Sequence, residues 1–236
     1  SPAPAGGSAV PGPTAGTSTG PAAVPAGTEA AAAHEQVTVT TDTQRLVFDT
    51  EGGSLVRAEF LKHAADHTAG RKEDPRFVLL QQTPQHTYVA QSGLIGGDFP
   101  NHKTVMTLVP GPRELAEGSN ELTLRFESPE KNGLKLVKTF TLKRGAYDMA
   151  VKHEIVNTGS QPATAQVYLQ LVRDGSKSGE DSAFYSTFTG PAAYTEEKKY
   201  QKVEFADIDK NKADFQTKSS AGYMAMVQHY FASAWL

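Results

Sequence analysis

Apolar residues recur at every second position over much of this chain, from Val37 onward. Polar residues such as Thr, Arg and Asp occupy the positions between them. Because side chains alternate between the two faces of a β-strand, this period of two is typical of strands with one buried face. The runs that show it are Val37 to Val39, Leu46 to Phe48, Leu122 to Phe126, Leu134 to Leu142, Met149 to Ile155 and Val167 to Leu171. We therefore expect an all-β fold.

Turn-forming residues separate these strand-like runs. They include Gly52-Gly53, Gly118, Asn132-Gly133, Gly145 and Gly159. Glycine accepts positive φ and asparagine bonds to its own backbone, so both suit tight reversals. Long strands joined by short turns form an antiparallel meander, and a sheet with one apolar face needs a second sheet to cover it. We predict an antiparallel β-sandwich with little helix.

Helical patterns are sparse, and short helical turns are predicted only at 61–68 and 196–200. The closing run, 222–236, is ambiguous. Tyr230, Phe231, Ala234 and Trp235 fit a helical stripe, whereas 223–227 and 230–236 also fit two strands. The content of Tyr, Phe, Val and Trp in this run favours strands.

The closing run is also the most hydrophobic stretch of the chain. Domains usually end in polar residues, since an apolar terminus left in water forfeits roughly 25 cal/mol for each Å² that it could bury. We therefore expect a piece of a larger protein, with a sandwich that is truncated at the C-terminus.

The N-terminal composition is different. From Ser1 to about Ala33 the chain is almost wholly Ala, Gly, Pro, Ser and Thr, without an aromatic residue. Such a segment cannot bury enough apolar area to offset its ordering entropy. We predict a disordered tether over 1–36 and a folded domain over 37–236. The tether would hold the domain away from an anchor such as a membrane, and a disordered tail without a mechanical role is an equal alternative.

Charge and composition exclude several classes of protein. The net charge is −3 and the isoelectric point is near 6.2, without a basic run, which argues against nucleic-acid binding. No window reaches the roughly 20 apolar residues of a membrane span. The chain has no cysteine, which excludes disulfides and thiolate chemistry.

Two spacings resemble metal sites, but neither is complete. His63 and His67 lie four residues apart, and zinc would need a third ligand. Residues 207–211 match the first three ligands of an EF-hand loop. Lys212 and Lys218 stand where that loop needs glycine and a bidentate glutamate, so a polar hairpin loop is favoured. We expect no metal and no cofactor.

Candidate catalytic residues are equally weak. Ser92 and Ser186 lack a nucleophile elbow. The segment 93–98 resembles a phosphate loop but lacks its lysine, which favours a loop at a strand end. Tyr147, two residues after a turn glycine, favours a sandwich corner anchored by its hydroxyl. We expect no catalytic residue.

Several segments together resemble the large periplasmic domain of the bacterial membrane protein insertase YidC, in collinear order from about Val37 to Leu236. They are Gln91-Ser92-Gly93-Leu94, Glu117-Gly118-x-Asn120-Glu121-Leu122, Lys138-x-Phe140-x-Leu142-Lys143-Arg144-Gly145-x-Tyr147, Gly190-x-Ala192-Ala193-Tyr194, Lys218-Ser219-Ser220 and Ala225-Met226-x-Gln228-x-Tyr230-Phe231-Ala232-x-Ala234-Trp235.

The resemblance implies a β-super-sandwich similar to galactose mutarotase, at the periplasmic face of the bacterial inner membrane. In that family the domain lies between the first two membrane spans, both absent here, and insertion belongs to the membrane-embedded core. The resemblance therefore implies a noncatalytic scaffold, with the Sec translocon auxiliary subunits and nascent membrane proteins as partners.

For partner contact we predict the stretch from Ala193 to Phe205, where Tyr194, Tyr200 and Phe205 lie among Glu and Lys. The alternative is that these aromatic residues cover the edge of the sandwich. Two other functions stay open: a chaperone-like groove that accepts an extended apolar peptide, and a sugar-binding, mutarotase-like module with convergent His and carboxylate groups.

Overall fold

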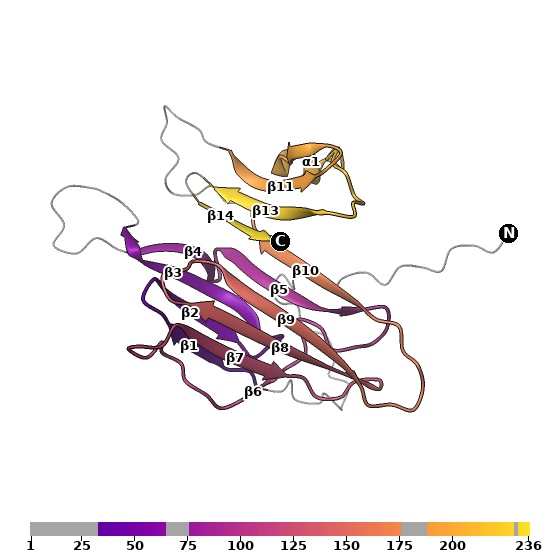
Figure 1. The fold of residues 1–236 in the computed structure, drawn as a ribbon. Helices are drawn as coiled ribbons and strands as arrows, with labels where there is room; N and C mark the ends of the chain where they lie inside the picture. Colours follow the sequence, from indigo (N-terminus) through magenta and orange to yellow (C-terminus); the bar gives the residue numbers. More distant parts are fainter. Residues whose placement is uncertain (1–32, 65–75, 176–187, 229–230) are drawn as a thin grey trace, which may run out of the picture.

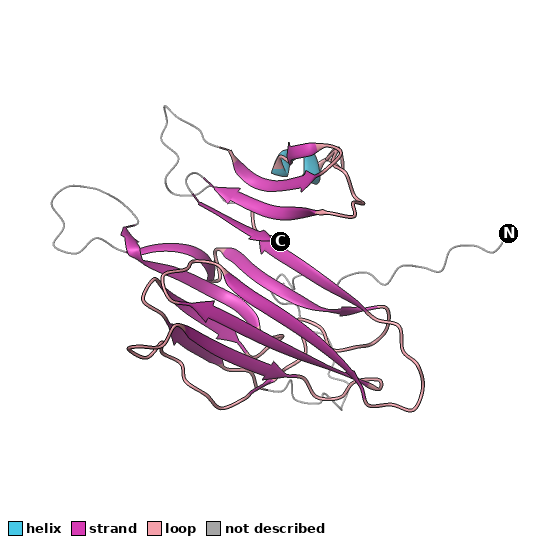
Figure 2. Ribbon diagram, viewed as in Figure 1, coloured by secondary structure: helices cyan, strands magenta, loops and turns pink. Residues whose placement is uncertain are grey.

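The structure is a computed structural model that describes residues 33–64, 76–175, 188–228 and 231–236. Figure 1 shows two packed sheets with a third, smaller sheet beside them, and Figure 2 shows how little helix accompanies the strands. The prediction of an antiparallel all-β sandwich is confirmed. Among the described residues, no helix is long and apolar enough to cross a membrane.

The first sheet has six strands in the order β1-β2-β3-β4-β5-β10. They are β1 (Gln36–Thr40), β2 (Gln44–Asp49), β3 (Ser54–Ala64), β4 (Arg76–Gln82), β5 (Thr87–Ile95) and β10 (Gln166–Arg173). The second sheet has the order β6-β7-β8-β9. Its strands are β6 (Thr107–Leu108), β7 (Glu121–Glu127), β8 (Leu134–Lys143) and β9 (Met149–Asn157).

The third sheet has the order β12-β11-β13-β14. Its strands are β11 (Thr189–Thr195), β12 (Lys199–Lys202), β13 (Gly222–Gln228) and β14 (Phe231–Trp235), and the short helix α1 (Phe205–Asp209) lies between β12 and β13 in the chain. Neighbouring strands pair antiparallel in all three sheets.

The sandwich core forms where the alternating apolar residues of the first two sheets meet. Phe48 of β2 lies 4.7 Å from Phe140 of β8 and 5.9 Å from Phe126 of β7, measured between ring centroids. Each such aromatic pair contributes about 0.5–1.5 kcal/mol beyond the burial of its area. The period of two thus places the large side chains on the faces that pack together.

The predicted turns hold residues with positive φ. Asn132 and Gly133 have φ of 51° and 81° between β7 and β8, the combination that a two-residue turn joining twisted strands requires. Gly52 has φ of 74°, and a Cβ atom there would lie 2.5 Å from the carbonyl oxygen of His102. Glycine is therefore required at position 52 for two reasons: the backbone has positive φ, and a Cβ atom would clash with His102.

The closing run forms strands, and the third sheet docks through them on the first. The ring of Phe231 in β14 stacks on Phe77 of β4 at 3.8 Å between centroids. The indole Nε1 of Trp235 donates to the carbonyl oxygen of Gln170 in β10 at 3.2 Å. The prediction of strands is confirmed for the described part of this run, and Tyr230 lies outside the described residues.

The turn predicted at 61–68 is wrong where the structure describes it, whereas the surface turn predicted at 196–200 is present at 196–198 as a hairpin turn. Leu61–Ala64 continues β3, because the backbone N–H of Leu61 bonds to Thr43 at 2.8 Å beside β2 and extends the sheet. Residues 196–200 form the turn of the β11–β12 hairpin and the start of β12. Conversely, Asp207 and Asp209 lie in α1, where a polar hairpin loop was predicted.

The tether predicted over 1–36 falls mainly on residues outside the described ranges and stays a prediction. At its end, Gln36 already pairs with Asp49 as the first residue of β1. His67 also lies outside the described residues, so the spacing of His63 and His67 stays a sequence pattern.

Candidate partner surface and buried basic cluster

Three tyrosines lie side by side across the third sheet. Tyr223 of β13, Tyr194 of β11 and Tyr200 of β12 are direct cross-strand partners, so their side chains share one face. The rings of Tyr194 and Tyr223 stack at 5.3 Å between centroids with 9° between their planes. Tyr200 is 45% exposed. We call these three residues the tyrosine ladder.

The β11–β12 hairpin adds charge next to the tyrosine ladder. Lys199 has φ of 58°, and its ammonium group lies 6.0 Å from the ring centroid of Tyr194. The backbone N–H of Lys198 donates to the Thr195 hydroxyl at 3.1 Å and closes the turn. The ladder therefore combines aromatic area, phenolic hydroxyls and ammonium groups, a composition suited to protein contact.

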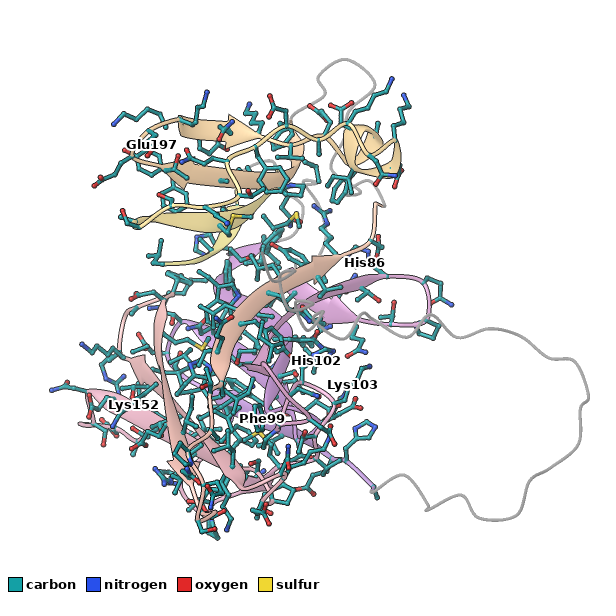
Figure 3. All side chains as sticks on the ribbon, turned by 90° about the vertical axis from the view of Figure 1, so that its right-hand side faces the viewer. His86, Phe99, His102, Lys103, Lys152 and Glu197 are labelled. Carbon is teal, nitrogen blue, oxygen red and sulfur yellow. The ribbon has the colours of Figure 1, made fainter. Side chains whose placement is uncertain are left out.

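Phe205 lies apart from the tyrosine ladder. It begins α1, is half-buried and packs against the core. Figure 3 places Glu197, in the hairpin turn, and the helix at opposite ends of the third sheet. The structure thus brings together Tyr194 and Tyr200 of the three predicted contact residues. It adds Tyr223, which is 29 residues from Tyr194 and was not predicted for this surface.

A second group of polar side chains lies between the first two sheets. Lys138 of β8 is completely buried, and its ammonium group donates to the carbonyl oxygens of Gly52 and Ser92 at 2.6 and 2.7 Å. His153 of β9, the cross-strand partner of Lys138, bonds through Nε2 to the Ser92 hydroxyl at 2.8 Å. Ser92 in β5 therefore joins one sheet to two strands of the other.

His102 continues this group on the other face of β5 and β10. Its backbone N–H donates to the hydroxyl oxygen of Tyr168 at 3.1 Å, and its Nδ1 also bonds to that hydroxyl. Figure 3 shows His102 beside Phe99 and Lys103, close to β10. We call Ser92, His102, Lys138, His153 and Tyr168 the buried basic cluster.

The comparison with known families covers nearly the entire described part of the chain. The model of the YidC periplasmic domain matches residues 36–236, which include all three sheets. The chain belongs to the YidC periplasmic domain family. The resemblance drawn from the sequence is thereby confirmed.

Individual YidC proteins give the same result. The chain is 49% identical over 206 residues to the membrane protein insertases YidC of Burkholderia mallei (strain SAVP1) and Burkholderia pseudomallei (strain K96243). The match covers 87% of this chain and 36% of each relative. The chain therefore spans about a third of the length of these relatives.

Two of the segments that resemble YidC lie in the buried basic cluster. Gln91–Leu94 contains Ser92, together with Gly93, where a Cβ atom would lie 2.7 Å from the Tyr168 hydroxyl. The segment from Lys138 to Tyr147 begins with the buried lysine. It ends at the predicted corner, where the Tyr147 hydroxyl lies 3.3 Å from Nδ1 of His63. These YidC segments thus coincide with contacts between sheets.

Burial shifts the pKa values in this YidC domain. Desolvation lowers the pKa of Lys138 to about 7. It lowers the pKa of His153 to about 4, with a further contribution from the Lys138 charge. For His102 the pKa is also lowered to about 4, first by burial and then by the charges of Lys103 and Lys138. In the described part of the chain, no carboxylate bonds to these three side chains to offset the cost of charge.

The chemistry of the cluster does not match that of a sugar-transforming site. The mutarotase-like alternative predicts convergent histidine and carboxylate groups, which act as acid and base. The structure brings together an amine, two imidazoles, an alcohol and a phenol. The arrangement can bridge sheets and bind protons.

Proposed function

We propose that this chain is the periplasmic domain of a membrane protein insertase and works as a noncatalytic scaffold and docking surface at the periplasmic face of the bacterial inner membrane. The observation that carries this proposal is the family match over residues 36–236. The relatives bear the name membrane protein insertase, and the matched part is a β-sandwich without a metal-ligating group of three or more side chains in its described ranges. Nascent membrane proteins would be the substrates of the parent protein.

The tyrosine ladder is the surface that we propose for docking. Tyrosine is enriched in protein interfaces because its ring offers apolar area and its hydroxyl can still bond. Tyr200 is exposed, and Tyr194 and Tyr223 are half-buried with their rings stacked. Auxiliary subunits of the Sec translocon are the proposed partners. Phe205, which packs against the core, would support this sheet from its far end.

The test is a pull-down of the translocon auxiliary subunits with the double variant Tyr194→Ala plus Tyr200→Ala. We expect capture to fall at least tenfold, since truncation of aromatic anchors in an interface costs about 2 kcal/mol or more. Met224→Ala is the matched control, because Met224 is 49% exposed on β13 and faces the other side of the same sheet. Undiminished capture by the double variant would remove the ladder from the proposal.

A second candidate function rests on the two edge strands of the sandwich, β9 and β10, of which β10 also accepts the indole N–H of Trp235 at Gln170. Among the described residues, β9 pairs only with β8 and β10 only with β5 within their sheets. Ile155, Val167 and Leu169 are 42%, 40% and 43% exposed. Their cross-strand partners Leu136, Leu94 and Ser92 are buried, so these three face inward at the edge. An extended apolar segment of a nascent membrane protein could pair with such an edge.

Titration with an extended apolar peptide, followed by backbone amide NMR, tests this second function. Pairing at an edge would shift amide signals of β9 or β10, with little change in β1 and β2. An unchanged spectrum at millimolar peptide would leave only the scaffold and docking functions.

A further inference from the structure

The buried basic cluster connects both edge strands of the sandwich through one continuous set of contacts. Tyr168 of β10 bonds to His102, and the backbone of His102 lies against Gly52. The carbonyl oxygen of Gly52 accepts from Lys138, which also bonds to Ser92. Ser92 bonds in turn to His153 of β9. The loss of a hydrogen bond at one member can therefore alter the contacts that hold β9, β10 and the strands between them.

His102 bonds to the Tyr168 hydroxyl through both its backbone N–H and its Nδ1. The Tyr168 oxygen accepts the backbone N–H and keeps one hydroxyl proton, for which Nδ1 of the neutral ring is an available acceptor. In that tautomer Nε2 carries the proton of the neutral ring. Within the described ranges, Nε2 is buried without a hydrogen-bond partner. Protonation of His102 would make Nδ1 a donor, would deprive the Tyr168 hydroxyl proton of that acceptor, and would place a charge on a ring whose Nε2 is buried without a partner.

Protonation of His153 would add a second charge beside Lys138. The two residues are direct cross-strand partners on the inner faces of β8 and β9. The nearest carboxylate on that strand, Glu154, faces outward and pairs with Arg125 at 3.3 Å. The other titratable groups around the cluster are Lys103 and Tyr168, neither of which supplies a negative charge at neutral pH.

We propose that the buried basic cluster is a proton-sensitive clamp, which holds the edge strands β9 and β10 on the sandwich at neutral pH and loosens them in mild acid. Opening would expose His102 and His153 to water and remove them from the lysine charges. The open state therefore binds protons that the closed state excludes, so acid favours opening.

The lowered pKa values set the pH window and size of this effect. Both histidines have a pKa of about 4 in the closed state and 6.5 when unperturbed. The closed state is therefore most favoured above pH 6.5, and its advantage declines as the pH falls toward 4. Between pH 7 and pH 5 we expect the opening equilibrium constant to rise roughly twentyfold for each histidine.

Hydrogen exchange of the whole 236-residue chain tests the proposal, with rates corrected for the intrinsic effect of pH. Protection of β9 and β10 amides should fall by two orders of magnitude or more between pH 7 and pH 5, whereas β1 and β2 should change far less. Equal loss in all strands would indicate global acid unfolding and overturn the clamp. Unchanged protection of β9 and β10 would overturn it as well.

Variants assign the effect to particular residues. His153→Gln keeps a polar group near Ser92 but cannot be charged. The factor by which β9 exchange rises between pH 7 and pH 5 should therefore be roughly twentyfold smaller than in the wild type. His63→Gln, at the distant Tyr147 corner, should leave it unchanged. An NMR titration of the wild-type imidazole signals keeps the test valid if a variant fails to fold. His102 and His153 should stay neutral at pH 5.5, and protonation of either near pH 6.5 would contradict the proposal.

Discussion

The primary amine of Lys138 is buried between two sheets and donates to two backbone carbonyl oxygens. In the described ranges no carboxylate bonds to it, and burial is the cause of its lowered pKa. Its position follows from the period of two, because Leu136, Lys138 and Phe140 occupy successive inward positions of β8. A lysine in an apolar alternation was therefore visible in the sequence. The acceptors that it meets come from β5 and the β2–β3 turn, which no local pattern reveals.

We predict that the unfolding free energy of the chain rises with pH above 7 because of Lys138. Its pKa is about 7 in the folded chain and 10.5 when unperturbed, so between these values the unfolded chain binds the proton that the folded chain lacks. The gain would reach about 1 kcal/mol per pH unit in this window, and it is lost as the pH falls toward 7.

Urea unfolding at pH 7, 8 and 9 measures this rise. Lys138→Met should flatten it, whereas Lys135→Met, on the exposed face of the same strand, should keep it. The same slope in both variants would mean that another group causes the rise.

A second residue-scale prediction concerns Gly52. Gly52→Ala meets positive φ and a contact of 2.5 Å with the His102 carbonyl oxygen, whereas Gly118→Ala meets positive φ of 79° with no atom within 4 Å. Positive φ costs a residue with a Cβ about 1–2 kcal/mol. We expect Gly118→Ala to lose about that much stability and Gly52→Ala at least about 1 kcal/mol more. Thermal unfolding of both variants measures the difference, and equal losses would show that the backbone at position 52 relaxes freely.

Elements with one buried face were predictable, whereas elements buried on both faces were not. Strands β1, β2, β7 and β8 follow the alternation of apolar and polar residues. In β10 the buried side chain is Tyr168, whereas Val167 and Leu169 on either side of it are 40% and 43% exposed. In β3, Leu55 and Val56 are both buried, so the alternation disappears there. The tyrosine ladder depends on the register of β11 with β13, which is fixed by contacts 29 residues apart. Local patterns cannot supply such a register.

A third prediction concerns Phe231, which holds the third sheet on the first. The ring of Phe231 joins β14 to β4 through Phe77 and to β3 through Phe60 and His63. Phe231→Ala should cost about 2–3 kcal/mol, because it removes a half-buried ring from an aromatic cluster. Hydrogen exchange should show the loss in β11, β13 and β14 while β1, β2 and β8 stay protected. Phe231→Leu should retain most of the protection, and uniform loss across all sheets would show that the third sheet is not a separate unit.

Within the described ranges, the outer sides of β9 and β10 pair with no further strand and lie beside inward apolar side chains, which is a recognised cause of strand-to-strand association. We predict that the 236-residue chain self-associates at high concentration through β9 and β10. Ile155→Lys plus Leu169→Lys should shift the sedimentation profile toward monomer. Val156→Lys is the control, since Val156 is 45% exposed but faces outward on β9. A profile that the double variant leaves unaltered would place the association elsewhere.

The fluorescence of Trp235 can report on the contact between the first and third sheets. It is the single tryptophan of the chain, and its indole N–H bonds to β10 at the joint between the first and third sheets. Its fluorescence emission should therefore shift to the red when water replaces that carbonyl oxygen. Separation of β14 from β10 could be followed in real time in this way, without any attached dye.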